Sequence, residues 1–128
     1  MIRIVKAAEY RFVVPGKAVS FRSHRAEEYK RKVRESARGL FKGPRKGSLD
    51  VRLDYFHTTG RRMDMDNISK CVLDSLTGLA YVDDQQVVLQ SSVAHDLTTD
   101  VQIADGPVDL VKPLQFYSDY LFVRLRPR

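Results

Sequence analysis

The chain has 128 residues, of which 43% are hydrophobic and 30% are charged, and its formal net charge is +6. This length fits one compact domain rather than two, and no apolar run approaches the roughly 20 residues needed to span a bilayer. The N-terminus lacks the continuous apolar stretch of a secretory signal and the lone Cys71 cannot form an internal disulfide, so a cytoplasmic location is expected.

Hydrophobic periodicity predicts four strands and two main helices. In chain order they are a strand over 10–14, a helix over 25–40, a strand over 49–55, a helix over 67–79, and strands over 87–94 and 120–125. Ser23 is the expected cap of the first helix. Residues 96–117 show no clear period and predict a long loop or insertion with a short helical excursion. The order β-α-β-α-β-β predicts a single α/β (α+β) domain over residues 1–128, with two helices covering a mixed β-sheet.

The charges are segregated along the chain. Residues 1–62 hold 17 Lys/Arg against 6 Asp/Glu, whereas residues 63–110 hold only Lys70 against nine Asp. Residues 111–128 are basic again, with four Lys/Arg against one Asp. A basic surface attracts polyanions, so a basic surface beside an acidic cluster indicates a nucleic-acid enzyme with a metal centre. The alternative is a solvated surface whose charges segregate only by sequence.

The acidic cluster has two parts, separated by the second predicted helix. Asp64 and Asp66 stand two residues apart, so in an extended segment both carboxylates point to one side. Asp66 is also the expected N-cap of that helix. The pair Asp83-Asp84 follows the helix, and we expect one of its carboxylates to join the first two. Three such oxygen donors suit Mg²⁺ or Mn²⁺.

A lysine lies on the same predicted helix face as the acidic cluster. Asp66, Lys70 and Asp74 are each four residues apart and therefore share one face. The functional interpretation directs Lys70 at a phosphate beside Asp64 and Asp66, with Asp74 holding its amine. The alternative interpretation is a surface ladder of ion pairs, each worth a few tenths of a kcal/mol.

Other chemistries find little support in the sequence. Neither a GxxxxGK[ST] loop nor a GxGxxG loop is present. Zinc is poorly matched by one cysteine and three scattered histidines.

The spacing of the acidic residues resembles the RusA family of Holliday-junction resolvases, whose approximate signature is D-x-D-N-x-x-K-x-x-x-D-x-L, a short spacer and D-D-x-Q-V. The matching positions are Arg62-Met63-Asp64-Met65-Asp66-Asn67, Lys70, Asp74, Leu76 and Asp83-Asp84-Gln85-Gln86-Val87. A weaker likeness extends to the Pro/Gly-containing residues 14–20.

This resemblance implies the roles of individual residues. Asp64, Asp66 and Asp84 would form the metal-binding catalytic set, with Lys70 as the essential lysine and Asp83 and Asn67 in support. It also implies a bacterial or phage-encoded homodimer that uses Mg²⁺, with Mn²⁺ as a substitute, to nick opposite strands of four-way DNA junctions in recombination and repair. A two-fold dimer would present two equivalent sites to a two-fold junction.

Exposed basic residues are the expected DNA-backbone contacts. The main candidates are Lys17, Arg22, Arg25, Arg61 and Arg62, and further ones are Arg11, Lys42, Arg45 and Lys46. Two features depart from the family pattern: residues 96–117 are longer than the usual connection, and residues 21–25 differ from the Asn-rich version. The alternatives are a non-catalytic branched-DNA-binding protein, a less selective DNA nuclease, or a hydrolase of small nucleotides.

Overall fold

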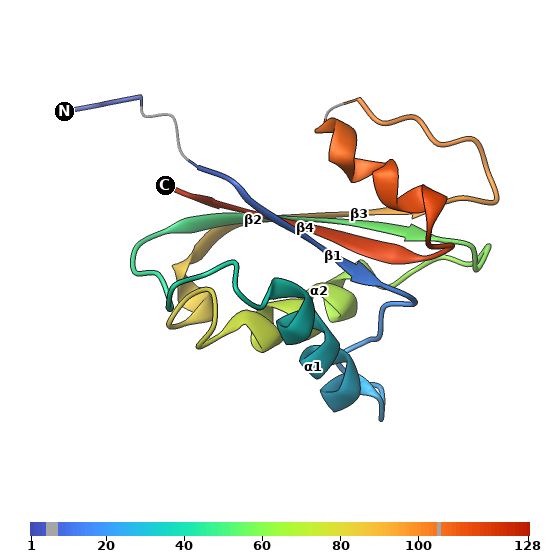
Figure 1. Ribbon diagram of the computed structural model, residues 1–128, viewed down its shortest axis with the longest axis horizontal. Helices are drawn as coiled ribbons and strands as arrows, with labels where there is room; N and C mark the ends of the chain where they lie inside the picture. The colour runs from blue at the N-terminus through green and yellow to red at the C-terminus, as the bar shows by residue number, and fades with distance from the viewer. Residues whose placement is uncertain (5–7, 105) are drawn as a thin grey trace.

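The computed structural model describes residues 1–4, 8–104 and 106–128 (Figure 1). The elements are strand β1 (Tyr10–Pro15), helix α1 (Ala26–Ala37), strand β2 (Leu49–His57), helix α2 (Met65–Leu76), the 3-10 turn η1 (Asp84–Gln86), strand β3 (Val87–Asp96), the 3-10 turns η2 (Val108–Leu110) and η3 (Lys112–Gln115), and strand β4 (Tyr120–Pro127). This order confirms the predicted α+β fold class.

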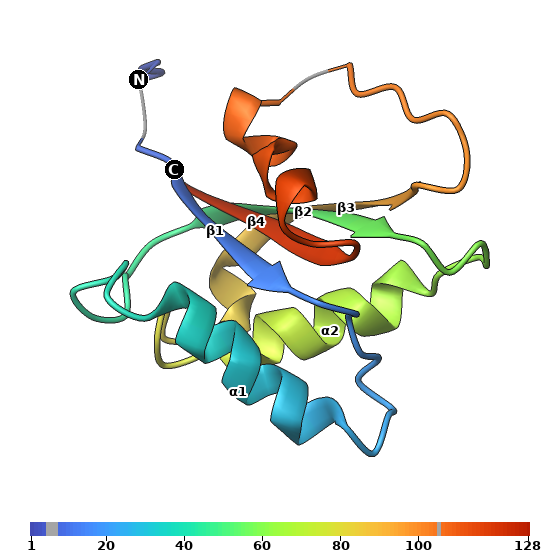
Figure 2. The ribbon, with the colours of Figure 1, turned by 45° about the vertical axis from the view of Figure 1, so that its right-hand side comes forward.

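The four strands form one mixed sheet in the order β1-β4-β2-β3. β3 lies parallel to β2, while β4 is antiparallel to both β1 and β2. Figure 2 shows three layers, in which α1 and α2 cover one face of the sheet and η2 and η3 cover the other. No helix in the described ranges is long and apolar enough to cross a membrane.

The alternation that predicted β2 places its side chains in two separate cores. Leu49, Val51 and Leu53 face the helices and are at most 1% exposed. Phe56 faces the other way and packs against Tyr120, Phe122 and Leu110. Because β2 is paired on both sides and buried on both faces, the residues that follow its end are held at a fixed place.

Both helix starts differ from the sequence prediction. α2 begins at Met65, two residues earlier than expected, and Asp64 rather than Asp66 is its N-cap. The predicted Ser23 cap of α1 is wrong, because Arg25 occupies the cap position without a side-chain hydrogen bond. Ser23 Oγ instead accepts a hydrogen bond from the Arg25 N–H, at 3.1 Å, in the turn before the helix.

After the end of β3 at Asp96, the described residues 97–104 and 106–117 form the loop with short helical turns that the sequence predicts. Their role is structural, since Leu110 of η2 is 1% exposed and packs on the outer face of the sheet. Tyr120 also donates a hydrogen bond from its hydroxyl to the Leu110 carbonyl at 2.7 Å. The segment therefore closes the second core.

A buried carboxylate on this outer face is held by three cationic or polar side chains. Asp54 is fully buried and accepts hydrogen bonds from His95 at 2.9 Å, Arg124 at 2.8 Å and Arg52 at 3.3 Å. Burial alone would raise the pKa of Asp54, but the bonds from His95 and Arg124 and the arginine charges together lower it below its ordinary value.

We expect Asp54→Asn to lower the free energy of unfolding by about 3 kcal/mol, because Arg124 would keep its charge while buried without a carboxylate.

The same carboxylate should make stability depend on pH. Because the pKa of Asp54 in the folded protein lies below the unfolded value of about 3.9, the ionised group stabilises the fold above that value, and this stability is lost as pH falls through the folded pKa. Wild-type unfolding temperatures should therefore fall more steeply below about pH 4 than those of the variant. Calorimetry across that range measures both effects. The control is Asp50→Asn, whose more exposed pair with Arg128 should cost less than about 1 kcal/mol, and equal losses would exclude the buried pair as the cause.

Candidate active site

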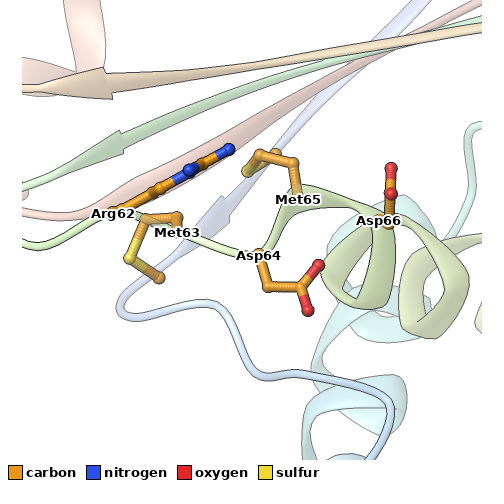
Figure 3. Close-up of a pocket in the computed structure, with 5 residues that line it drawn as sticks. All are labelled: Arg62, Met63, Asp64, Met65 and Asp66. Atoms are coloured by element: carbon orange, nitrogen blue, oxygen red, sulfur yellow. The ribbon is translucent and has the colours of Figure 1, made fainter.

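The candidate active site lies where β2 leads into α2. Asp64 and Asp66 are both exposed there, in an open hollow of about 510 Å³ lined by residues 62–66 (Figure 3). Arg62 supplies a cationic side chain to the same hollow. The hollow is therefore polar, open to a large ligand and of mixed charge.

The turn before the hollow is fastened to the sheet. The Thr58 hydroxyl donates a 2.7 Å hydrogen bond to Asp119, which is buried just before β4. Thr59 shares a 3.0 Å contact with the ring of buried His57. Gly60 adopts a φ of 67°, a conformation that a side chain at this turn would strain. These contacts fix the approach of the chain to Asp64.

Asn67 holds the carboxylate of Asp64. The Asn67 backbone N–H donates to one carboxylate oxygen at 3.3 Å, and its side-chain amide donates to the other at 2.7 Å. Asp64 thus serves as the N-cap, where a negative charge is also favoured by the helix dipole. Through these two bonds, Asn67 orients the carboxylate of Asp64.

The expectation that Asp64 and Asp66 point to one side is wrong. Because α2 starts at Met65, Asp66 is already inside the first helical turn, and two helical positions lie about 200° apart around the axis. Figure 3 shows the Asp66 carboxylate directed away from that of Asp64. The two side chains share one hollow without converging on one point.

Asp84 lies at the opposite end of α2. Val87 pairs with Leu49 at the start of β2, whereas Asp64 follows the end of that strand. Asp64 and Asp84 also flank a helix of 12 residues, which is about 18 Å long, and Figure 1 shows η1 beyond the far end of α2. The expectation that Asp84 joins Asp64 and Asp66 is therefore wrong for a single chain. In the described ranges, no three His, Cys, Asp or Glu side chains lie close enough to hold a metal ion, so one chain does not fit the implied metal.

The second acidic pair has a clear division of roles. Asp83 caps η1 by accepting the Gln85 N–H at 2.8 Å, and it leaves Asp84 exposed beside it. A hydrogen bond with Asp83 raises the pKa of Asp84, as do partial burial and the negative charges of Asp83 and Asp74. Asp84 therefore sits among negative charges, where a cation would be stabilised.

Gln86 fixes this acidic turn, a role that the sequence analysis missed. Its side-chain oxygen accepts the Asp83 N–H at 3.0 Å, and its amide donates to the carbonyls of Arg45 and Gly47 at 2.8 and 2.9 Å. A Gln three residues after a capping Asp is the capping-box pattern, so the sequence contained a signal for it.

Lys70 has a different neighbour from the one expected. Asp74 forms its 3.3 Å ion pair with Lys30 of α1, so the expected Lys70–Asp74 pair is wrong. The Lys70 ammonium instead lies 5.2 Å from the centre of the Phe21 ring. Lys70 is exposed and lies one helical turn after Asp66, which lines the hollow.

The main DNA-contact candidates lie around the same end of α2. All five (Lys17, Arg22, Arg25, Arg61 and Arg62) are exposed, and none forms a side-chain ion pair in the described part of the chain. Arg61 and Arg62 directly precede the site, and the loop that carries the other three is bonded to Asn67 through the Phe21 N–H. The side chains of two further candidates already have partners. Arg11 forms ion pairs with Glu9 and Asp109, and Arg45 donates a hydrogen bond to the Tyr10 hydroxyl.

A mixed sheet that presents exposed aspartates at a helix start, with a lysine and free arginines around them, has the features of a nuclease that cuts a polyanionic chain. The sequence profile described as endodeoxyribonuclease RusA matches residues 3–104. The chain therefore belongs to the RusA family. A comparison with curated proteins finds no match. The matched range contains every proposed site residue and ends before η2, η3 and β4.

Proposed function

We propose that the protein is a Mg²⁺-dependent, structure-selective endodeoxyribonuclease that resolves four-way (Holliday) junctions by paired nicking in recombination and repair. The observation that carries the proposal is the exposed pair Asp64 and Asp66 in a hollow that Arg62 also lines, in a chain of the RusA family. Intact acidic residues weigh against a non-catalytic junction binder. The many exposed cations favour a long substrate over a small nucleotide.

The proposed enzyme is a homodimer, because a single chain separates the implied metal ligands. A second copy of the chain offers the missing carboxylate if Asp84 of one protomer approaches Asp64 and Asp66 of its partner. Each of the two sites would then draw residues from both chains. Asp84 is exposed in the single chain, so its carboxylate is accessible to a second copy.

Strand β3 offers a contact surface with the required geometry. It is an edge strand of ten residues, and it exposes Val88, Leu89 and Val93 by 53%, 46% and 37%. No Lys, Arg or Pro protects residues 87–94, although such residues commonly guard exposed edges. Antiparallel pairing of two β3 strands about a two-fold axis would place the start of one strand, and with it Asp84, beside the end of the other. Because β2 runs parallel to β3, that is also the end at which the partner chain enters its own α2.

In this assembly Asp64, Asp66 and Asp84 would hold Mg²⁺, and Mn²⁺ would substitute for it. A bound divalent ion would polarise the scissile phosphate and favour attack by water. Asn67 would orient Asp64, while Asp83 and Gln86 would fix the turn that carries Asp84. Lys70 would supply positive charge to a phosphate oxygen. Arg61, Arg62 and the loop cations Lys17, Arg22 and Arg25 would position the DNA backbone without reading its sequence.

The test is incubation of purified protein with an end-labelled mobile four-way junction and a linear duplex of matched sequence, with and without Mg²⁺. We expect paired, symmetric nicks in the junction alone, only when Mg²⁺ or Mn²⁺ is present. Equal cutting of the duplex would identify a less selective nuclease. Junction binding without cutting in either metal would replace the proposal with a non-catalytic binder.

A further inference from the structure

Phe21, in the loop between β1 and α1, is a large aromatic side chain left partly in solvent. It is 38% exposed, and two ammonium groups lie against the same ring. The Lys70 nitrogen is 5.2 Å and the Lys30 nitrogen 5.5 Å from the ring centre. Both distances are within the range of a cation–π contact. Packing in the core does not account for a ring in this position.

The place of the Phe21 ring is set by the backbone. The Phe21 N–H donates a 3.0 Å hydrogen bond to the Asn67 carbonyl in the first turn of α2. Figure 2 shows the loop passing beside the start of this helix. Asn67 is also the residue whose side chain holds Asp64. The ring is thereby tied to the same turn of α2 that orients the candidate active site.

The two lysines on this ring differ in their charge partners. Lys30 forms 3.3 Å ion pairs with Glu27 and with Asp74, so its charge is balanced. Lys70 forms no ion pair with any residue in the described ranges. A ring attracts an ammonium without neutralising it, so the Lys70 N–H groups stay available for an anionic ligand. Because the Asp74 carboxylate is paired with Lys30, it does not compete with an anionic ligand for Lys70.

We propose that Phe21 is a positioning residue, which holds the Lys70 ammonium beside the Asp64/Asp66 hollow and leaves its charge free for a DNA phosphate. This inference rests on the proposed function, since it assigns the restrained lysine to the substrate of that site. The negative charge that develops on the scissile phosphate in the transition state would meet a cation whose side chain is already ordered. Less conformational entropy is therefore lost at that step, so the effect falls on the cleavage rate and not on the affinity for DNA.

The test compares Phe21→Leu, which keeps an apolar side chain but loses the π face, with Phe21→Tyr and Phe21→Trp, which retain it. We expect Phe21→Leu to lower the single-turnover cleavage rate of the junction about three- to tenfold with an unchanged Kd. The Tyr and Trp variants should stay within about twofold of wild type. In DNA-free protein labelled with ¹³C-lysine, the Lys70 Cε–H signal, assigned with Lys70→Arg, should be shifted upfield by the ring. That shift should vanish only in Phe21→Leu.

The matched control is Phe116→Leu, the same change at an exposed phenylalanine on the other face of the sheet, which should alter neither measurement. A Lys70 signal that is identical in wild type and Phe21→Leu overturns the contact itself. A normal cleavage rate in Phe21→Leu overturns the positioning role and leaves junction cleavage standing. A wild type that cuts no junction ends the proposed function and the role of Phe21 in it, while the lysine signal still reports the contact.

Discussion

Replacement of Asp66 by asparagine is expected to lower the rate of junction cleavage by on the order of 10³-fold or more, because it removes an anionic oxygen that the proposed reaction requires. Junction affinity should be unchanged or higher, since the change also removes a negative charge that would repel DNA phosphates in the proposed complex. Asp66 is exposed, and among the described residues its side chain makes no hydrogen bond, so the variant should fold normally. Single-turnover cleavage in Mg²⁺ and junction binding without metal measure the two effects.

Two further variants make this result specific. Asp64→Asn should lose cleavage to a similar extent yet keep α2, because Asn and Asp are nearly equal as N-caps. Asp100→Asn is the matched control, an exposed aspartate in the loop after β3, and it should cut at the wild-type rate. If Asp66→Asn cleaved the junction within tenfold of wild type, the assignment of this carboxylate to the reaction would be wrong.

The order of strands and helices could be predicted from the sequence because each element carries its own local pattern. β2 alternates strictly from Leu49 to Tyr55 and becomes one of the two inner strands, buried on both faces. α2 places Ile68, Val72 and Leu76 on one buried side, as its spacing predicts. These patterns are local and need no knowledge of what lies across the sheet.

The geometry of the site depends on contacts that no local pattern contains. A shift of two residues in the start of α2 turns Asp66 away from Asp64, and helix ends are the least predictable part of a helix. Asp74 pairs with Lys30, a residue 44 positions earlier. Phe21, in the loop between β1 and α1, contacts Lys70 of α2. Asp84 is separated from Asp64 because β2 and β3 are parallel. After the end of β2, the chain must return along the whole length of α2 before β3 can begin beside the start of β2.

The same separation gives the second large prediction, which concerns mixed dimers. Asp66→Asn and Asp84→Asn chains should each be inactive alone, but a reassembled mixture should regain nicking. In a mixed dimer with shared sites, one site would hold both substitutions and the other would hold none. Random pairing would therefore restore about a quarter of all sites. If each site belonged to a single chain, every site in the mixture would carry one substitution and no activity would return.

The products distinguish this arrangement from contamination by wild type. A mixed dimer has one working site, so it should release nicked junctions and few paired, symmetric cuts, whereas residual wild type would give paired cuts. The control mixture joins Asp66→Asn with Asp64→Asn chains, whose substitutions fall in the same half of each shared site. Each site in that mixture lacks one carboxylate, and it should stay inactive at the same concentrations. If the control mixture regained activity, the proposal that one chain supplies Asp64 and Asp66 and its partner supplies Asp84 would be wrong. If neither mixture nicked the junction although light scattering confirmed dimers, each site would lie within one chain. Asp84 would then act outside the site that contains Asp64 and Asp66.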